Sequence, residues 1–104
     1  HLMGDNSKAI FYIKEAIKNK YSSKDLYDLY AEIAHAMKDY DQAIDAFIHL
    51  IKINPQNAQS YANLAMTYFE KKDYQKAREV ANQAIEKFPK LRGQIQAFID
   101  KIPK

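Results

Sequence analysis

The sequence predicts an all-α fold in which antiparallel helical hairpins stack into a solenoid of about six helices. Tyr27 and Tyr61 are 34 positions apart, and so are Pro55 and Pro89, so the chain repeats itself in register. Two glycines and three prolines among 104 residues leave few turns for strand hairpins. A period of this length is typical of units that bury their apolar faces only against their neighbours.

The first predicted helix covers residues 5–20. Shifted by 34 positions, Ala9 and Ile13 fall on the places of Ala43 and Phe47, which belong to the second helix of a later hairpin. The segment is therefore interpreted as the second helix of a truncated repeat. We expect its isoleucines, Ile10, Ile13 and Ile17, to be partly uncovered and available for self-association. Residues 1–3 are interpreted as a tag remnant and excluded.

Two complete units are predicted at residues 24–57 and 58–91. Small residues such as Ala31 and Ala65 allow two helices to approach closely, while aromatic side chains fill the remaining space. Each unit ends at a proline, since Pro cannot donate an interior helix bond. Asp39 and Asp73 are positioned to cap the second helix of their units, and Gln42 completes a pattern similar to a capping box.

The last predicted helix, residues 92–102, has apolar residues at helical spacing, including Ile95, Phe98 and Ile102. Its other face carries Arg92 and Asp100, and this polarity favours a capping helix over the first helix of a further unit. The chain from residue 4 to 104 is thus predicted to be a single domain.

Composition excludes several classes. Hydrophobic residues make up 47% of the chain, enough for one core, but no run of 18 apolar residues predicts a membrane span. The absence of cysteine excludes disulfides and leaves the compartment undecided. Net charge is +5 from residue 71 onward and −3 over residues 24–53. The basic half could bind nucleic acid, but solvated helix faces explain it better.

No catalytic constellation is found, and we expect no enzyme, metal or cofactor. His35 and His49 lie on different predicted helices and lack the spacing of a zinc site. Ser60 has no nucleophile elbow around it, and Gly4 and Gly93 are too isolated to form a phosphate-binding loop.

The repeat resembles the tetratricopeptide repeat, whose pattern runs from a large aromatic through Leu-Gly and Tyr to Ala-x3-Phe and a late Pro. The second unit reads Tyr61-x2-Leu64-Ala65-x2-Tyr68, then Ala77-x3-Ala81 and Pro89, and the first ends with Ala43-x3-Phe47 and Pro55. Both carry Tyr for Trp and Ala for Gly, and the first also has Tyr30 for Leu and Ala34 for Tyr, which is ordinary variation among large or among small residues. The resemblance implies a right-handed solenoid with two full repeats, a preceding half repeat and a C-terminal capping helix.

In that family the first helix of each repeat lines a concave groove that binds partner peptides. Transferred to this chain, the groove would be lined by Asp25, Asp28, Leu29, Glu32, His35, Gln59, Ala62, Asn63, Met66, Phe69 and Glu70. Acids from the first unit and apolar area from the second suit a partner segment with basic and apolar side chains. Alternatively, Met66 and Phe69 lie buried under the C-terminal helix.

Three functions stay open. A protein-interaction module with a scaffold or adaptor role is favoured, structural self-assembly is the alternative, and nucleic-acid binding is a minor one. Family members that grip the acidic tails of chaperones use a clamp of lysines, asparagines and an arginine. Only Asn63 of that clamp is present, and Asp28 and Glu32 would repel a carboxylate, so this role is disfavoured.

Overall fold

A computed structural model describes residues 3–18 and 24–103, and the side chains of residues 8–16 and 24–103. Over these ranges the chain forms six α-helices and one 3-10 turn, with no strand: α1 (Met3–Lys18), α2 (Lys24–Ala36), α3 (Tyr40–Ile53), α4 (Ala58–Lys71), α5 (Tyr74–Lys87), η1 (Pro89–Leu91) and α6 (Arg92–Lys101). The all-α class and the number of helices are confirmed. The repeat boundaries at 24–57 and 58–91 stay a prediction.

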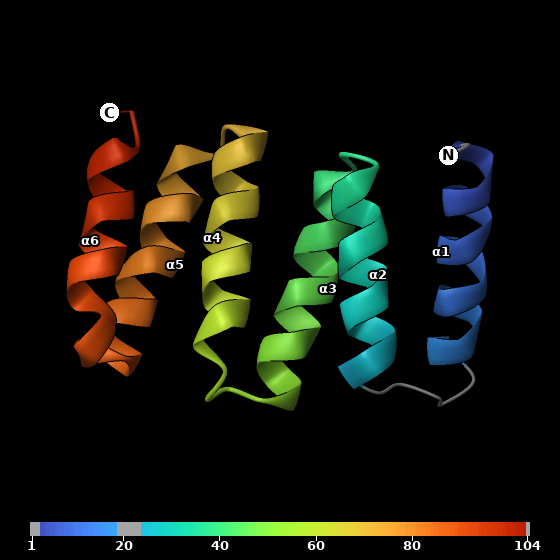
Figure 1. Ribbon diagram of the computed structural model, residues 1–104, viewed down its shortest axis with the longest axis horizontal. Helices are drawn as coiled ribbons and strands as arrows, with labels where there is room; N and C mark the ends of the chain where they lie inside the picture. The colour runs from blue at the N-terminus through green and yellow to red at the C-terminus, as the bar shows by residue number, and fades with distance from the viewer. Residues whose placement is uncertain (1–2, 19–23, 104) are drawn as a thin grey trace.

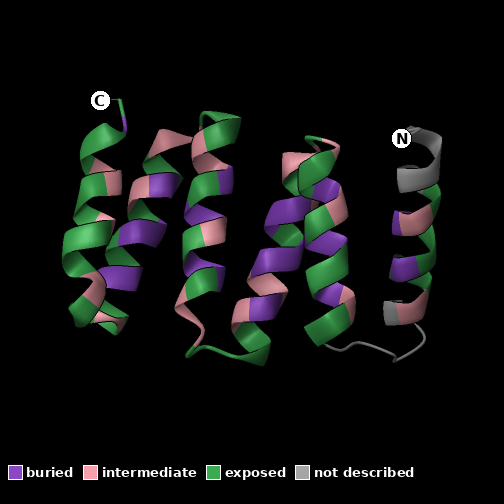
Figure 2. Ribbon diagram, in the orientation of Figure 1, coloured by how far each residue is buried: buried purple, intermediate pink, exposed green. Residues whose placement is uncertain are grey.

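The helices stand in a row in which each packs against the next along the chain, from α1 at one end to α6 at the other (Figure 1). The molecule is elongated, measuring 38 × 26 × 19 Å. Buried positions run along the facing sides of neighbouring helices (Figure 2). The core combines alanines with no exposed area, such as Ala34 and Ala43, with the larger Tyr30, Phe47 and Leu64. Small residues thus set the helix spacing and large ones fill it.

The hairpin turns repeat the same geometry in both units. Lys38 and Lys72 have positive φ angles of 61° and 72°, and they close the first helix of each hairpin. In the first turn the N–H of Asp39 donates to the carbonyl of Ala34, and in the second the N–H of Asp73 donates to the carbonyl of Tyr68. These bonds define a Schellman motif, which satisfies carbonyls that the helix end leaves without a partner.

Asp39 and Asp73 then begin the second helix of each hairpin, as predicted. The Asp39 side chain accepts from the backbone N–H of Gln42, and the Asp73 side chain accepts from that of Lys76. The capping box is only partly formed, because the Gln42 amide donates to the Asp39 carboxylate instead of reaching its backbone N–H. Asn57 caps α4 in the same way through the N–H of Gln59.

The N-terminal helix differs from the prediction. The prediction that Ile10 and Ile13 are partly uncovered is wrong. Both side chains are buried, with only 5% and 6% of their surface exposed, because they face the core beside α2. The exposed apolar side chains of α1 are instead Phe11 and Tyr12, at 59% and 68%, with their rings in edge contact at 5.6 Å. The Ile17 side chain lies outside the described residues. The helix begins at Met3, within the segment interpreted as a tag remnant.

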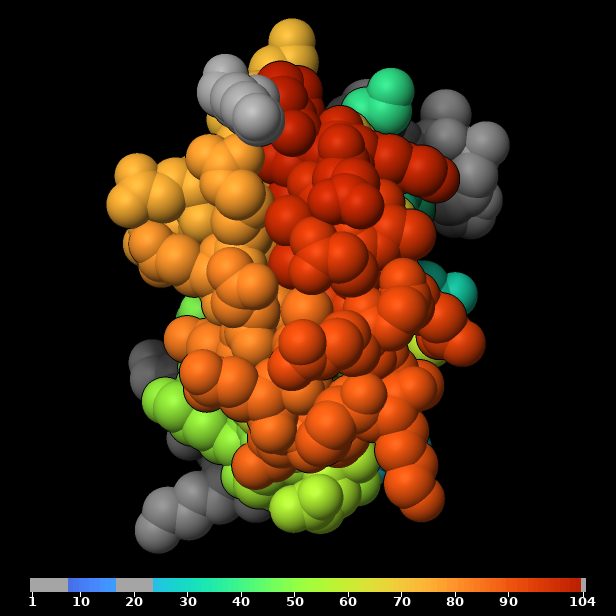
Figure 3. Space-filling view, turned by 90° about the vertical axis from the view of Figure 1, so that its left-hand side faces the viewer, coloured from blue at the N-terminus to red at the C-terminus, as the bar shows by residue number. Residues whose placement is uncertain are grey.

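The C-terminal helix α6 packs on α5, and Figure 3 looks directly onto this end of the row, where the two helices lie side by side. Ile95 and Phe98 are half-buried, and no residue within α6 is fully buried. Ile102, just beyond the helix, is buried, and the Arg78 guanidinium donates to the Pro103 carbonyl at 2.9 Å. Residues 102 and 103 therefore contact the body of the domain beyond the last turn of α6.

Candidate functional site

A polar hollow of about 320 Å³ lies between α2 and α4. Its residues come from three helices, with acids on one wall and amide and hydroxyl groups on the other. They are Asp28, Ala31, Glu32, His35, Phe47, Asn63, Met66 and Thr67. Phe47 of α3 is buried, while Asp28 and Glu32 are exposed. The hollow therefore presents negative charge to solvent above an aromatic side chain.

Ion pairs and hydrogen bonds fix several of its side chains. The Lys24 ammonium donates to Asp28 Oδ2 at 2.6 Å, and this bond raises the pKa of Lys24. Among the described residues, no cation lies within ion-pair distance of Glu32. Since Asp28 already has a cationic neighbour, Glu32 is the carboxylate that an incoming cation would meet unpaired.

The two repeats are linked at the end of this hollow. His35 Nε2 donates to Glu70 Oε1 at 2.7 Å, joining the last turns of α2 and α4. A second link between units, Lys71 to Asp41, joins α4 to α3, and the hydrogen bond raises the pKa of Lys71. Both pairs are largely exposed, so they orient side chains more than they stabilise the fold.

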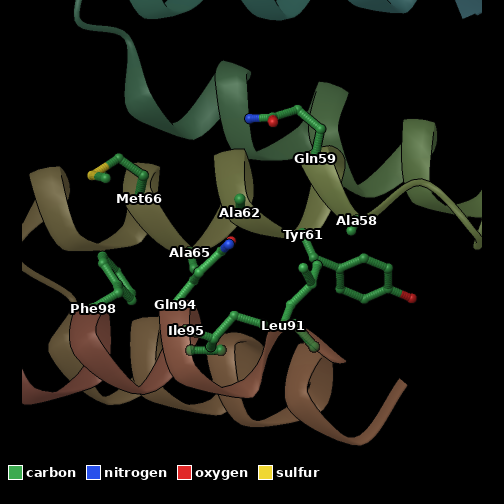
Figure 4. Close-up of a pocket in the computed structure, with 12 residues that line it drawn as sticks. Ala58, Gln59, Tyr61, Ala62, Ala65, Met66, Leu91, Gln94, Ile95 and Phe98 are labelled. Atoms are coloured by element: carbon green, nitrogen blue, oxygen red, sulfur yellow. The ribbon is translucent and has the colours of Figure 1, made fainter. Parts of the chain in front are cut away.

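A second hollow, of about 240 Å³, lies between α4 and α6. Figure 4 shows Leu91, Ile95 and Phe98 extending from the C-terminal segment toward the alanines of α4. The hollow is largely apolar and is lined by Ala58, Gln59, Tyr61, Ala62, Ala65, Met66, Ala81, Ala84, Leu91, Gln94, Ile95 and Phe98. Gln59 and Gln94 supply its amide groups. Met66 lines both hollows and separates them.

The two hollows occupy equivalent places in successive repeats, but their chemistry differs. Positions 28, 31 and 32 of the first correspond to 62, 65 and 66 of the second, each 34 residues later. The first therefore has two carboxylates where the second has Ala62 and Met66. Phe47 lines the first, whereas the equivalent Ala81 leaves space beneath α4 and α6 in the second.

The structure places seven residues that the sequence assigned to a groove in the two hollows, and one of them lines both. The polar hollow contains Asp28, Glu32, His35, Asn63 and Met66, and the apolar hollow contains Gln59, Ala62 and again Met66. This leaves seven different residues in the hollows and four outside them.

Asp25, Leu29, Phe69 and Glu70 line neither hollow. Leu29 is exposed, and Glu70 is held by His35. Phe69 is half-buried, with its ring 5.9 Å from that of Phe98, so it contacts the C-terminal helix without being buried beneath it. Met66, at 46% exposed, is not buried under the C-terminal helix.

Sequence reasoning missed the residues that α5 and α6 contribute to the apolar hollow, among them Ala81, Gln94 and Ile95. One signal was present: Ala81 replaces the aromatic residue that the repeat pattern expects. A small residue at a place normally filled by a large one predicts a void when the neighbouring helices keep their spacing.

The remaining candidate groups take part in packing. The His49 ring stacks on Tyr27 at 4.9 Å, with Nδ1 2.8 Å from the Asp45 carbonyl, and Ser60 is buried. Within residues 3–18 and 24–103, no group of three His, Cys, Asp or Glu side chains could hold a metal ion. None of the described helices has the length and apolar character needed to cross a bilayer.

Paired helices in register, with side chains repeating every 34 residues, define a helical-repeat protein. The family model described as tetratricopeptide repeat matches residues 34–102, and the chain belongs to this family. It is also 25% identical over 99 residues to tetratricopeptide repeat protein 12 of Mus musculus. That match covers 95% of this chain but 14% of the relative. Family membership indicates a protein-interaction module and protein partners, and such repeats generally serve as scaffolds without enzymatic activity.

Proposed function

We propose that this domain binds a segment of a partner protein along α2 and α4, and that the segment carries basic and apolar side chains. The observation that carries the proposal is the polar hollow, in which Asp28 and Glu32 stand opposite Asn63. A Lys or Arg side chain would gain charge-assisted hydrogen bonds there. The Asn63 amide, half-buried and already accepting from Gln59 at 2.9 Å, keeps its NH2 group for a peptide carbonyl.

Charge complementarity supports a basic partner over an acidic one. Over residues 24–53 the chain has a net charge of −3, and the exposed acids of α2 contribute to it. An acidic segment would meet repulsion from Glu32, whereas a basic segment would be attracted and oriented. Exposed charges act mostly on the association rate and on specificity, so binding should weaken as salt is raised.

A peptide-display screen followed by a titration tests this function. Selection of random peptides on the immobilised domain should enrich Lys or Arg together with large apolar residues. A fluorescent selected peptide should then bind wild type, lose most of its affinity to the Asn63→Ala, Met66→Ala double variant, and bind about tenfold more weakly to Asp28→Asn, Glu32→Gln. Circular dichroism should show unchanged helix content in both variants.

The matched control removes the same two charges elsewhere. Asp45 of α3 and Glu86 of α5 are exposed and line neither hollow. Asp45→Asn, Glu86→Gln should therefore bind nearly as wild type. If Asp45→Asn, Glu86→Gln weakens binding as much as Asp28→Asn, Glu32→Gln does, the effect comes from net charge alone and the polar hollow is not the site. Enrichment of acidic peptides would also contradict the proposal.

Self-association is a second candidate function, favoured by the exposed Phe11 and Tyr12 pair on α1. Two adjacent aromatic side chains are suited to contact with another protein surface. Light scattering over a wide concentration range would detect it. A mass that rises with concentration for wild type but not for Phe11→Gln, Tyr12→Gln supports assembly through this surface, and a constant monomer mass contradicts it.

A further inference from the structure

We infer that the apolar hollow between α4 and α6 is a specificity pocket for one large apolar side chain of the partner segment, set at a fixed spacing from the basic side chain held by Asp28 and Glu32. This inference rests on the proposed function and deepens it. It assigns a role to residues of α5 and α6 that the repeat pattern does not place in a groove. The occupant is a Leu, Ile, Met or Phe side chain on the same segment.

The size and chemistry of the hollow suit one side chain. Its volume of about 240 Å³ is below the range of sites that hold a whole small-molecule ligand. Its walls are alanines, Leu91, Ile95, Phe98 and Met66, which offer dispersion contacts and no charge. Gln59 and Gln94 are exposed, and their amides can bond the backbone that carries the inserted side chain.

Ala81 of α5 lines the apolar hollow at the place where the first repeat has Phe47. At the equivalent place in the first repeat, Phe47 is buried between the helices, and the polar hollow there is lined by its ring. Ala81 is 2% exposed, so it lines the deep side of the hollow with a methyl group where the first repeat has a phenyl ring. A ligand side chain can supply the contacts that an internal phenylalanine supplies in the first repeat.

The acids of the neighbouring hollow identify the kind of segment that reaches this pocket. Both hollows adjoin α4, one on each side, and Met66 lines both. A helix with its side chains is about 10 Å wide, and extended chain advances about 3.3 Å per residue. The basic and apolar residues of the partner should therefore be separated by about three positions.

Short fluorescent peptides in a Gly-Ser background provide the probe. One set carries a lysine and a leucine two, three or four positions apart, and the controls replace the leucine by alanine or place it directly beside the lysine. By fluorescence anisotropy, the best spaced peptide should bind about ten to a hundred times more tightly than its alanine counterpart, since burying a leucine side chain contributes on that scale.

Filling the hollow in the protein should remove this advantage. Ala81→Phe introduces the residue that the first repeat has at the equivalent position, Phe47. Ala62→Leu narrows the hollow from an exposed position on α4. Each should bind the leucine peptide as weakly as wild type binds the alanine peptide, and neither should weaken the alanine peptide further. Ala97→Leu, an exposed change on α6 outside the hollow, is the matched control and should bind as wild type.

The outcomes separate this inference from the function on which it rests. If no lysine peptide binds, the proposed function fails and the pocket fails with it. If lysine peptides bind and Asp28→Asn, Glu32→Gln weakens them, but neither the leucine nor the filling variants change affinity, the pocket alone is overturned. Should Ala81→Phe disturb the fold by circular dichroism, Ala62→Leu decides by the same comparison.

Discussion

Asp28 and Ala62 occupy the same place in successive repeats, and this difference makes the first hollow charged and the second apolar. The same holds for Glu32 and Met66, 34 residues apart. The positions are equivalent in the repeat, so the two hollows differ by their side chains: two carboxylates in the first, an alanine and a methionine in the second. Repeat proteins can change specificity in this way without changing fold, because each repeat contacts only its neighbours.

Tyr30 is a buried polar side chain that connects the core with the acids of the first repeat. It is 2% exposed, and its hydroxyl donates to Gln42 Oε1 at 3.3 Å. Burial raises the pKa of Tyr30 to about 12, and the negative charges of Asp45 and Asp39 add to the effect. The folded state therefore favours the neutral phenol.

This pKa makes stability depend on pH in the alkaline range. The unfolded chain releases the Tyr30 proton near the ordinary value of about 10 and the folded chain near 12, so Tyr30 favours folding fully below pH 10 and progressively less as pH rises toward 12. Urea unfolding across this range should show that the free energy of unfolding falls less steeply with rising pH for Tyr30→Phe than for wild type. Tyr12→Phe, at an exposed position, should keep the wild-type slope, and equal slopes for all three proteins would contradict the account.

At the scale of the element, the turn between the two helices of each hairpin has a lysine where glycine is the usual residue. Lys38 and Lys72 adopt the left-handed conformation, which costs an L-residue roughly 1–2 kcal/mol and glycine much less. The adjacent Asp39 and Asp73 cap the next helix, so each turn combines an unfavourable residue with a favourable one. The sequence match between these turns extends to their backbone angles.

Lys72→Gly should raise the free energy of unfolding by about 0.5–1 kcal/mol, because relief of the left-handed strain exceeds the added entropy of the unfolded chain. Urea denaturation followed by circular dichroism measures it. Lys52→Gly, at an exposed position in the last turn of α3, is the matched control and should lower stability by about 1 kcal/mol. Destabilisation by both changes would show that φ at Lys72 is not strained.

Much of the fold could be predicted from the sequence because the same pattern occurs in both repeats, and each occurrence supports the other. The helices of the two complete units are indicated twice, by the spacing of their apolar residues and by the matching residues 34 positions away, and the caps at Asp39 and Asp73 follow from local chemistry. The site was predicted less well. Which of Ile13 or Phe11 is covered depends on the rotation of α1 against α2, and the position of Phe69 depends on where α6 packs.

Contacts between helices far apart in the sequence explain the rest. The bond from His35 to Glu70 and the hollow beneath Ile95 exist only once the hairpins are stacked at a fixed spacing. The spacing between the stacked hairpins is set by many small packing contacts together, so it cannot be predicted from any single residue. Ala81 was visible as a departure from the pattern, but whether a neighbour fills the space is a property of the whole molecule.

Over the whole molecule, the proposed function and pocket make α2, α4 and α6 one continuous recognition surface, with a cationic side chain bound at one hollow and an apolar side chain at the next. Amide chemical shifts measured by nuclear magnetic resonance, during titration with the spaced lysine and leucine peptide, test it most directly. The account predicts that the largest shifts cluster at Glu32, Asn63, Met66 and Ile95, with small changes at exposed positions of α3 and α5 such as Asp45 and Glu86. Shifts confined to α3 and α5, or spread evenly over the row of helices, would contradict it.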